Sequence, residues 1–294
     1  MTTRQEWIQG ARPLTLPAAI APVVVGSAIA YFEGSARPLI AIFALVVALA
    51  FQIGVNYSND YSDGIKGTDA DRIGPVRLVG QGLAPADAVK RAAFISFGVG
   101  AIAGLLIVAI SGLWILIPVG IACIVAAWYY TGGKNPYGYL GFGELFVFVF
   151  FGLVAVIGTS FAQTGVFSEL QLLGGVACGS LSVAILVTNN LRDRAKDMVA
   201  GKKTLAVRIG DKKTREVYRT AILVAFAMPV VMTVLENGPK FAYISLATML
   251  TARRPLMAVQ GGASGADLIP VLVDTSKLLI LFALSLSVGI SASP

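Results

Sequence analysis

The sequence predicts an all-α, polytopic membrane protein with nine transmembrane helices. Of its 294 residues, 56% are hydrophobic and only 13% are charged, whereas soluble domains carry about 25% charged residues. A series of apolar stretches also reaches the length of around 20 residues that is needed to cross a bilayer. In chain order, the expected helices span about residues 14–32, 38–58, 88–110, 113–130, 143–164, 170–190, 217–235, 240–252 and 271–290.

The loops between these helices have a strong charge bias. With nine spans, the N-terminus and the loops after the second, fourth, sixth and eighth helices lie on one side of the membrane, and they hold 20 of the 23 Lys and Arg residues. The other side holds only Arg37 and Lys240. Because positive residues accumulate in cytoplasmic loops, we expect a cell-membrane protein whose N-terminus and long polar loops, at about 59–87 and 191–216, face the cytoplasm.

Composition also excludes several kinds of site. The chain has no His, and its two Cys residues, Cys123 and Cys178, lie inside apolar runs. A zinc site and a disulfide framework are therefore not expected, and any metal should be a hard cation with oxygen ligands. The net charge of +7 follows from topology and from contact with anionic membrane lipid or phosphate, so no nucleic-acid partner is needed to explain it.

A short pattern of amide and carboxylate residues occurs twice, at the cytoplasmic ends of the second and sixth expected helices. In each copy an Asp follows an Asn by four residues, and another Asp comes three or four residues later. The interval between the copies predicts two similar four-helix halves plus a ninth helix. The residues are Asn56, Asp60 and Asp63 in the first copy and Asn189, Asp193 and Asp197 in the second.

This spacing places the polar side chains on one helix face if both helices continue past their Asn. If the two halves pack face to face, four carboxylates converge, and divalent cations would relieve their repulsion. Mg²⁺ favours a few carboxylates combined with substrate phosphates. We therefore expect the four Asp residues of the two motifs to bind Mg²⁺ on a diphosphate.

Basic residues flank both acidic motifs. Arg and Lys can bind the phosphate oxygens that a metal does not reach. The residues expected in this role are Arg72, Arg77, Arg192 and Lys202.

A third cytoplasmic loop carries Lys134 together with Tyr130, Tyr137 and Tyr139. Aromatic rings can stabilise a cation over their faces, which makes these tyrosines candidates for substrate binding. The alternative is that they are interfacial residues of the membrane belt. In the same way, the loop residues Asp69 and Asp71 are as readily explained as solvated flanks.

Several segments resemble the UbiA-type intramembrane prenyltransferases, and the resemblance covers nearly the whole chain. The two acidic segments resemble the aspartate-rich motifs of that family. The remaining segments are similar to the branch that prenylates 1,4-dihydroxy-2-naphthoate in menaquinone synthesis, especially its actinobacterial members. The matching segments are GARPLTLPAAIAPVVVG (10–26), NDYSD (59–63), GTDADRIGPVRLV (67–79), YTGGKNPYGYLGFGE (130–144), NNLRDRAKD (189–197) and AGKKTLAVRIG (200–210).

The resemblance implies nine helices around a central cavity open to the cytoplasmic leaflet, with two Mg²⁺ ions on the aspartate motifs. It implies that a polyprenyl group passes from polyprenyl diphosphate to 1,4-dihydroxy-2-naphthoate with loss of CO₂ and diphosphate, giving demethylmenaquinol. Catalytic roles are expected for Asp60, Asp193, Asp197 and Lys134. The chain departs from the broader superfamily at Gly67, where many members have an additional Asp; here Asp69 follows two positions later.

Two alternatives stay open at this stage. The same fold could act on another aromatic acceptor, such as 4-hydroxybenzoate, homogentisate or a tetrapyrrole precursor. The chain could instead be a secondary transporter, because repeated halves and intramembrane charges occur in transporters. The acidic motifs, however, cluster at one membrane face, and only Asp274 and Lys277 are expected within the membrane.

Overall fold

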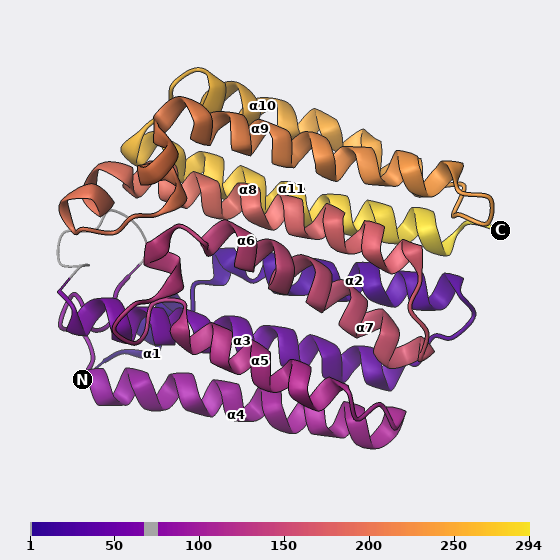
Figure 1. The fold of residues 1–294 in the computed structure, drawn as a ribbon, viewed down its shortest axis with the longest axis horizontal. Helices are drawn as coiled ribbons and strands as arrows, with labels where there is room; N and C mark the ends of the chain where they lie inside the picture. Colours follow the sequence, from indigo (N-terminus) through magenta and orange to yellow (C-terminus); the bar gives the residue numbers. More distant parts are fainter. Residues whose placement is uncertain (1, 68–75) are drawn as a thin grey trace.

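The computed structural model describes residues 2–67 and 76–294, and within them the regular elements are all helices. Figure 1 shows an elongated bundle of near-parallel helices. The elements are α1 (Arg4–Gly10), η1 (Pro13–Thr15), α2 (Pro17–Phe32), α3 (Pro38–Ile65), α4 (Ala86–Ser111), α5 (Leu116–Tyr129), η2 (Tyr137–Leu140), α6 (Gly143–Phe148), η3 (Val149–Val154), α7 (Ala155–Thr164), α8 (Glu169–Val199), α9 (Leu205–Val234), η4 (Ala242–Thr248), α10 (Met249–Gln260), η5 (Gly265–Asp267) and α11 (Leu268–Ser291).

The described residues include six helices that are long and apolar enough to cross a membrane, or seven if the bent pair Arg4–Thr15 and Pro17–Phe32 forms one span. Each of the nine expected ranges overlaps a helix. Two of these helices are short, however: α5 has 14 residues and α10 has 12, which gives about 21 Å and 18 Å of helix. The all-helical class is confirmed, whereas the count of nine spans and the two-halves arrangement stay predictions.

The bounds expected for the two long polar loops, 59–87 and 191–216, are wrong: both loops start later, and the second also ends earlier. Helix α3 continues to Ile65 and α8 continues to Val199, and α9 already begins at Leu205. The helices persist because the polar side chains of both motifs find partners inside the protein, so they need no solvated loop. The condition for placing each motif on one helix face is therefore met.

The described part of the bundle has three hydrophobic core clusters, the smallest of them around Ile40. Helices α2, α8, α9 and α11 share the largest core cluster, which includes Leu181, Tyr218 and Phe282. Helices α3 and α4 share a second cluster with Leu78, which follows the first motif. Large apolar side chains such as Ile102 on α4 and Leu250 on α10 are exposed on the outside, as expected for helices that contact lipid.

Helix α6 is joined to α7 through a π-helical turn, Val149–Val154, and the whole unit lies close to α8. The closest approach is at Gly152. A Cβ atom there would lie 2.5 Å from the carbonyl oxygen of Gly175 and from the Cα atom of Gly179. Only glycine permits this backbone contact. It brings the start of α6, with Glu144, against the end of α8.

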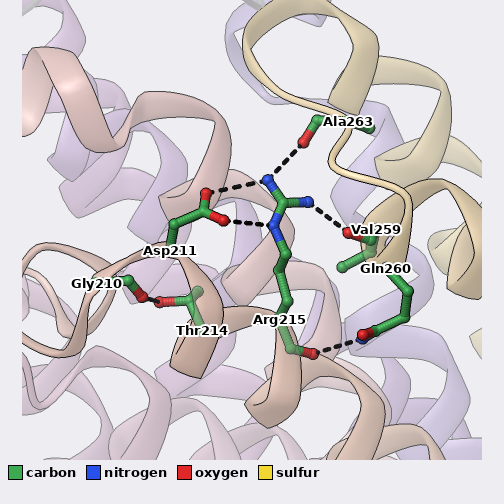
Figure 2. Close-up of polar contacts among 7 residues, drawn as sticks. All are labelled: Gly210, Asp211, Thr214, Arg215, Val259, Gln260 and Ala263. Carbon is green, nitrogen blue, oxygen red and sulfur yellow. Dashed lines mark hydrogen bonds and ion pairs between the residues drawn. The ribbon is translucent and has the colours of Figure 1, made fainter.

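Helix α9 bends at Gly210, whose φ of 79° and ψ of 174° are not helical. An ion pair fixes the chain just beyond the bend: the Arg215 guanidinium bonds both carboxylate oxygens of Asp211, at 2.6 and 3.0 Å. The same guanidinium donates to the carbonyl oxygens of Val259 and Ala263 at the end of α10 (Figure 2). The part of α9 just beyond the bend is thereby anchored to the end of α10.

Candidate functional site

A cavity of about 1090 Å³ runs through the bundle and connects a polar end to an apolar end. Asp63, Asp197 and Lys202 line its polar end, near the C-termini of α3 and α8. At the other end of the cavity, near the N-terminus of α3 and the C-terminus of α7, the lining includes Ala44 and Ala162. The cavity therefore offers a charged mouth for an ionic group and an apolar interior for a long hydrocarbon.

The two carboxylates of the first motif have different surroundings. Asp60 is 1% exposed and does not line the cavity; its oxygens accept hydrogen bonds from the backbone N–H groups of Leu78, at 2.7 Å, and Val79, at 3.2 Å. Asp63 is 3% exposed but lines the cavity, where it accepts a hydrogen bond from the Tyr139 hydroxyl. One carboxylate thus holds the following loop, and the other faces the site.

The second motif shows the same division. Asp193 lies outside the cavity lining and is bound by its neighbour Arg192 through two hydrogen bonds of 2.8 Å. Asp197 lines the cavity and accepts a 3.4 Å hydrogen bond from the Thr204 hydroxyl. Arg192 itself lines the cavity, so its charge is shared between Asp193 and the site.

Both motif asparagines line the cavity. The Asn56 amide donates to the carbonyl oxygen of Ala11 at 2.9 Å and to the Thr15 hydroxyl at 3.1 Å, which fixes the turn before α2. Gln52, one turn earlier on α3, donates to the same Thr15 hydroxyl at 2.8 Å. Helix α3 therefore holds the N-terminal turn against the site through its polar face.

The loop between α5 and α6 connects the two motifs. The ammonium group of Lys202 lies 3.4 Å from Asp63 Oδ1 and 4.5 Å from the centre of the Tyr139 ring. The ammonium of Lys66 lies 5.0 Å from the same ring centre and donates to the Thr131 carbonyl oxygen. Burial lowers the pKa of Lys66, the Asp63 carboxylate opposes this shift, and Lys202 adds to it. Basic groups are thus concentrated around one buried carboxylate.

The other two tyrosines of this loop form an aromatic wall of the cavity. The rings of Tyr130 and Tyr137 meet edge to face, with centroids 5.5 Å apart, and Tyr137 stacks on Phe146 at 3.9 Å. The Tyr137 hydroxyl donates to the Ala126 carbonyl oxygen, and burial raises the pKa of this phenol. By contrast, Lys134 is exposed and does not line the cavity.

Most of the predicted site residues meet at this cavity. Asp60, Asp193 and Lys134 are described but do not line it, and Arg72, Asp69 and Asp71 lie outside the described residues. Tyr139, expected beside Tyr130 and Tyr137, lines the cavity too, whereas sequence reasoning missed Arg12, Asn59 and Asn190 of the lining. Predicted residues in the lining are Asn56, Asp63, Arg77, Tyr130, Tyr137, Asn189, Arg192, Asp197 and Lys202.

The donor chemistry at the mouth fits a hard cation. Asp63, Asp197, Asn56 and Asn189, whose side chains all carry oxygen atoms, line the cavity, and Mg²⁺ takes a few carboxylates with water and phosphate. Within residues 2–67 and 76–294 there is no group of three or more acidic, His or Cys side chains arranged to hold a metal by itself. The arrangement therefore fits a cation whose remaining ligands come from substrate or water.

Comparison with protein families identifies the chain. A model of the UbiA prenyltransferase family matches residues 19–260. The chain belongs to the UbiA prenyltransferase family. This membership, together with the apolar helices, makes it a multi-pass membrane protein of an enzyme family, and it favours an enzyme over the transporter alternative.

Two curated relatives that cover most of the chain carry the same name. The 1,4-dihydroxy-2-naphthoate octaprenyltransferase of Mycobacterium tuberculosis is 49% identical over 98% of this chain and 97% of its own length. The protein of the same name from Escherichia coli is 40% identical over 74% of this chain and 73% of its own length.

Solved structures support the fold. A UbiA homologue from Aeropyrum pernix K1 has a TM-score of 0.73 over 93% of this chain and 97% of its own, at 14% identity. A UbiA homologue from Archaeoglobus fulgidus, bound to DMAPP and Mg²⁺, has a TM-score of 0.66 over 98% of this chain and 99% of its own, at 12% identity.

Proposed function

We propose that the protein transfers a polyprenyl group from polyprenyl diphosphate to 1,4-dihydroxy-2-naphthoate. The bond between prenyl C1 and the diphosphate oxygen breaks, the diphosphate leaves with the electron pair, and the electron-rich ring forms a bond to C1. The ring carboxylate is lost as CO₂, and the product is demethylmenaquinol. The observation that carries this proposal is a single cavity with a charged mouth and an apolar interior, in a chain 49% identical to a named naphthoate prenyltransferase.

The mouth of the cavity binds the diphosphate in this proposal. Lys202, Arg192 and Arg77 line it and can donate charge-assisted hydrogen bonds to phosphate oxygens. Arg72, which lies outside the described residues, is proposed for the same role. These cations stabilise negative charge as it develops on the leaving diphosphate.

The acidic residues at the mouth would hold Mg²⁺. Asp63 and Asp197 line the cavity directly, and Asp60 and Asp193 stand one helical turn before them on α3 and α8. When bound, Mg²⁺ neutralises charge on the diphosphate and so improves it as a leaving group. The UbiA homologue bound to DMAPP and Mg²⁺ supports this assignment by fold alone.

The apolar part of the cavity has two roles in this proposal. It accommodates the isoprenoid tail between helices α3, α4, α5 and α7, and it keeps water from the allylic carbon while positive charge develops there. The prenyl donor is itself a membrane lipid, so a site at one end of a lipid-facing bundle is reached without leaving the bilayer. We further propose nine spans, two halves, and a cytoplasmic location for the N-terminus and the cavity mouth, following the charge bias.

The proposal is tested by incubating purified protein with Mg²⁺, labelled polyprenyl diphosphate and one aromatic acceptor at a time. We expect prenylated product and released diphosphate with 1,4-dihydroxy-2-naphthoate, and no product when Mg²⁺ is chelated. Faster transfer to 4-hydroxybenzoate, homogentisate or a tetrapyrrole precursor would mean that this compound, and not the naphthoate, is the acceptor. Solute uptake into vesicles without diphosphate release would return the transporter alternative.

A further inference from the structure

A buried carboxyl group lies behind the cavity wall, beside the second motif. Glu144, in the first turn of α6, is 7% exposed and does not line the cavity. Its Oε1 accepts a 2.8 Å hydrogen bond from the side-chain amide of Asn190 on α8, and its Oε2 has no hydrogen-bond partner among the described residues. Burying such a group is costly, so its presence beside the site calls for a function.

The contact fixes which end of the Asn190 amide faces the cavity. A carboxyl Oε1 that has no proton can only accept, so Asn190 must turn its Nδ2 group toward Glu144. The reverse orientation would place two acceptor oxygens against each other. Asn190 lines the cavity, and with Nδ2 turned to Glu144 the end of the amide that remains for a ligand in the cavity is its acceptor oxygen, Oδ1.

The surroundings of Asn190 fit a flat aromatic ring. Tyr130, Tyr137 and Leu186 line the same cavity, and a Cβ atom on Gly143, next to Glu144, would lie 3.3 Å from both the Tyr130 hydroxyl and Leu186 Cδ2. Residue 186 precedes Asn190 by one helical turn. Tyr137 is held rigid by its stack on Phe146 and by its hydrogen bond to Ala126. The wall is thus aromatic and apolar, with one oriented acceptor.

We propose that Asn190 Oδ1 accepts a hydrogen bond from a hydroxyl group of the aromatic acceptor, and that Glu144 is the positioning residue that sets this orientation. The inference rests on the proposed function and deepens it. It places the acceptor ring against Tyr130 and Tyr137, on the side of the mouth formed by α6 and α8.

The test measures KM for each substrate in purified variants. In Asn190→Leu and Glu144→Leu we expect the KM for the naphthoate to rise about tenfold, the equivalent of one hydrogen bond, while the KM for polyprenyl diphosphate changes by less than about twofold. Glu144→Gln should keep the naphthoate KM close to that of wild type, because the Gln carbonyl oxygen can still accept from Asn190. Glu144→Leu combined with Asn190→Leu should be no worse than Asn190→Leu alone, because the two residues act as one unit.

Analogues of the acceptor identify the hydroxyl. Naphthoates that lack the 1-hydroxyl or the 4-hydroxyl are measured as competitive inhibitors of wild type and of Asn190→Leu. The analogue that lacks the recognised hydroxyl should inhibit both proteins equally, whereas the other should lose about tenfold in potency against the variant.

Three results would overturn the inference: an unchanged naphthoate KM in Asn190→Leu, equal increases in both KM values, or equal losses for both analogues. The second of these would assign Glu144 and Asn190 to folding, and thermal stability of the extracted variants would show it. Failure of the proposed function looks different, because wild type would then make no naphthoate product at all.

Discussion

The two acidic motifs are arranged alike, but the Asp of each that does not line the cavity has a different kind of partner. In each, the Asp nearer the Asn is turned to a partner inside the protein, and the next Asp lines the cavity. On α3, Asp60 binds two backbone N–H groups of the chain that follows the motif. On α8, Asp193 binds the guanidinium of Arg192, the residue beside it. The first motif thus fixes a loop, and the second fixes a cation that faces the site.

This difference explains why the two halves of the site need not respond alike to substitution. Loss of the Asp60 carboxylate leaves buried backbone donors without their acceptor, whereas loss of the Asp193 carboxylate releases a positive charge into the cavity. The cavity-facing residues, Asp63 and Asp197, should behave more alike, because both are carboxylates that line the same cavity.

The largest effects should come from the cavity-facing pair. Asp63→Asn and Asp197→Asn each remove one negative charge from the proposed Mg²⁺ site, and we expect kcat to fall at least about 100-fold. The measurement is labelled prenyl transfer by purified variants over a range of Mg²⁺ concentrations. A large fall in only one variant would show that the two motifs do not contribute equally. Near wild-type turnover in both would contradict the assignment of Asp63 and Asp197 to Mg²⁺.

The next prediction distinguishes Asp60 from Asp193, the two motif carboxylates that do not line the cavity. Asp60→Ala should lose transfer activity and also about 1–3 kcal/mol of stability, because two backbone N–H groups lose their acceptor. The loss of stability is measured by thermal unfolding in detergent. Asp193→Ala is the matched variant, and we expect its clearest change in the KM for polyprenyl diphosphate, because Arg192 is freed toward the diphosphate. Equal losses of stability in both would contradict the distinction.

A smaller effect should follow from the groups that hold the cavity-facing carboxylates. Tyr139→Phe removes the hydroxyl that donates to Asp63 but keeps the ring beside Lys202, and we expect kcat to fall about threefold to tenfold. Thr204→Val removes the 3.4 Å bond to Asp197, which is long and therefore weak. Its effect on kcat should be smaller, and a larger effect than that of Tyr139→Phe would contradict this order.

The smallest effect is expected at Lys134. This residue is exposed and outside the cavity lining, so Lys134→Ala should change kcat and both KM values by less than about twofold. Lys202→Ala serves as the contrasting variant, because Lys202 is buried against Asp63. A strong loss in Lys134→Ala would mean that the loop closes over the substrate and brings this lysine into the site.

The sequence predicted the paired motifs and their common location because helical periodicity alone puts residues four apart on one face. It could not predict the partners of Asp60, because backbone donors in the segment around Leu78 leave no pattern in the side chains. Nor could it separate Asn189 from Asn190. Which of two neighbouring amides meets Glu144 depends on the π-helical turn and the Gly152 contact that set α6 against α8.

The central claim is that Asp63 and Asp197 face one cavity and hold Mg²⁺ on the diphosphate. The most direct test is a structure of the protein with Mg²⁺ and a non-reactive polyprenyl diphosphate analogue. We predict a cation at about 2.0–2.1 Å from carboxylate oxygens of both residues, with the diphosphate between them and Lys202 and the tail in the apolar part of the cavity. A diphosphate bound away from both carboxylates, or a cation that touches neither, would contradict the claim.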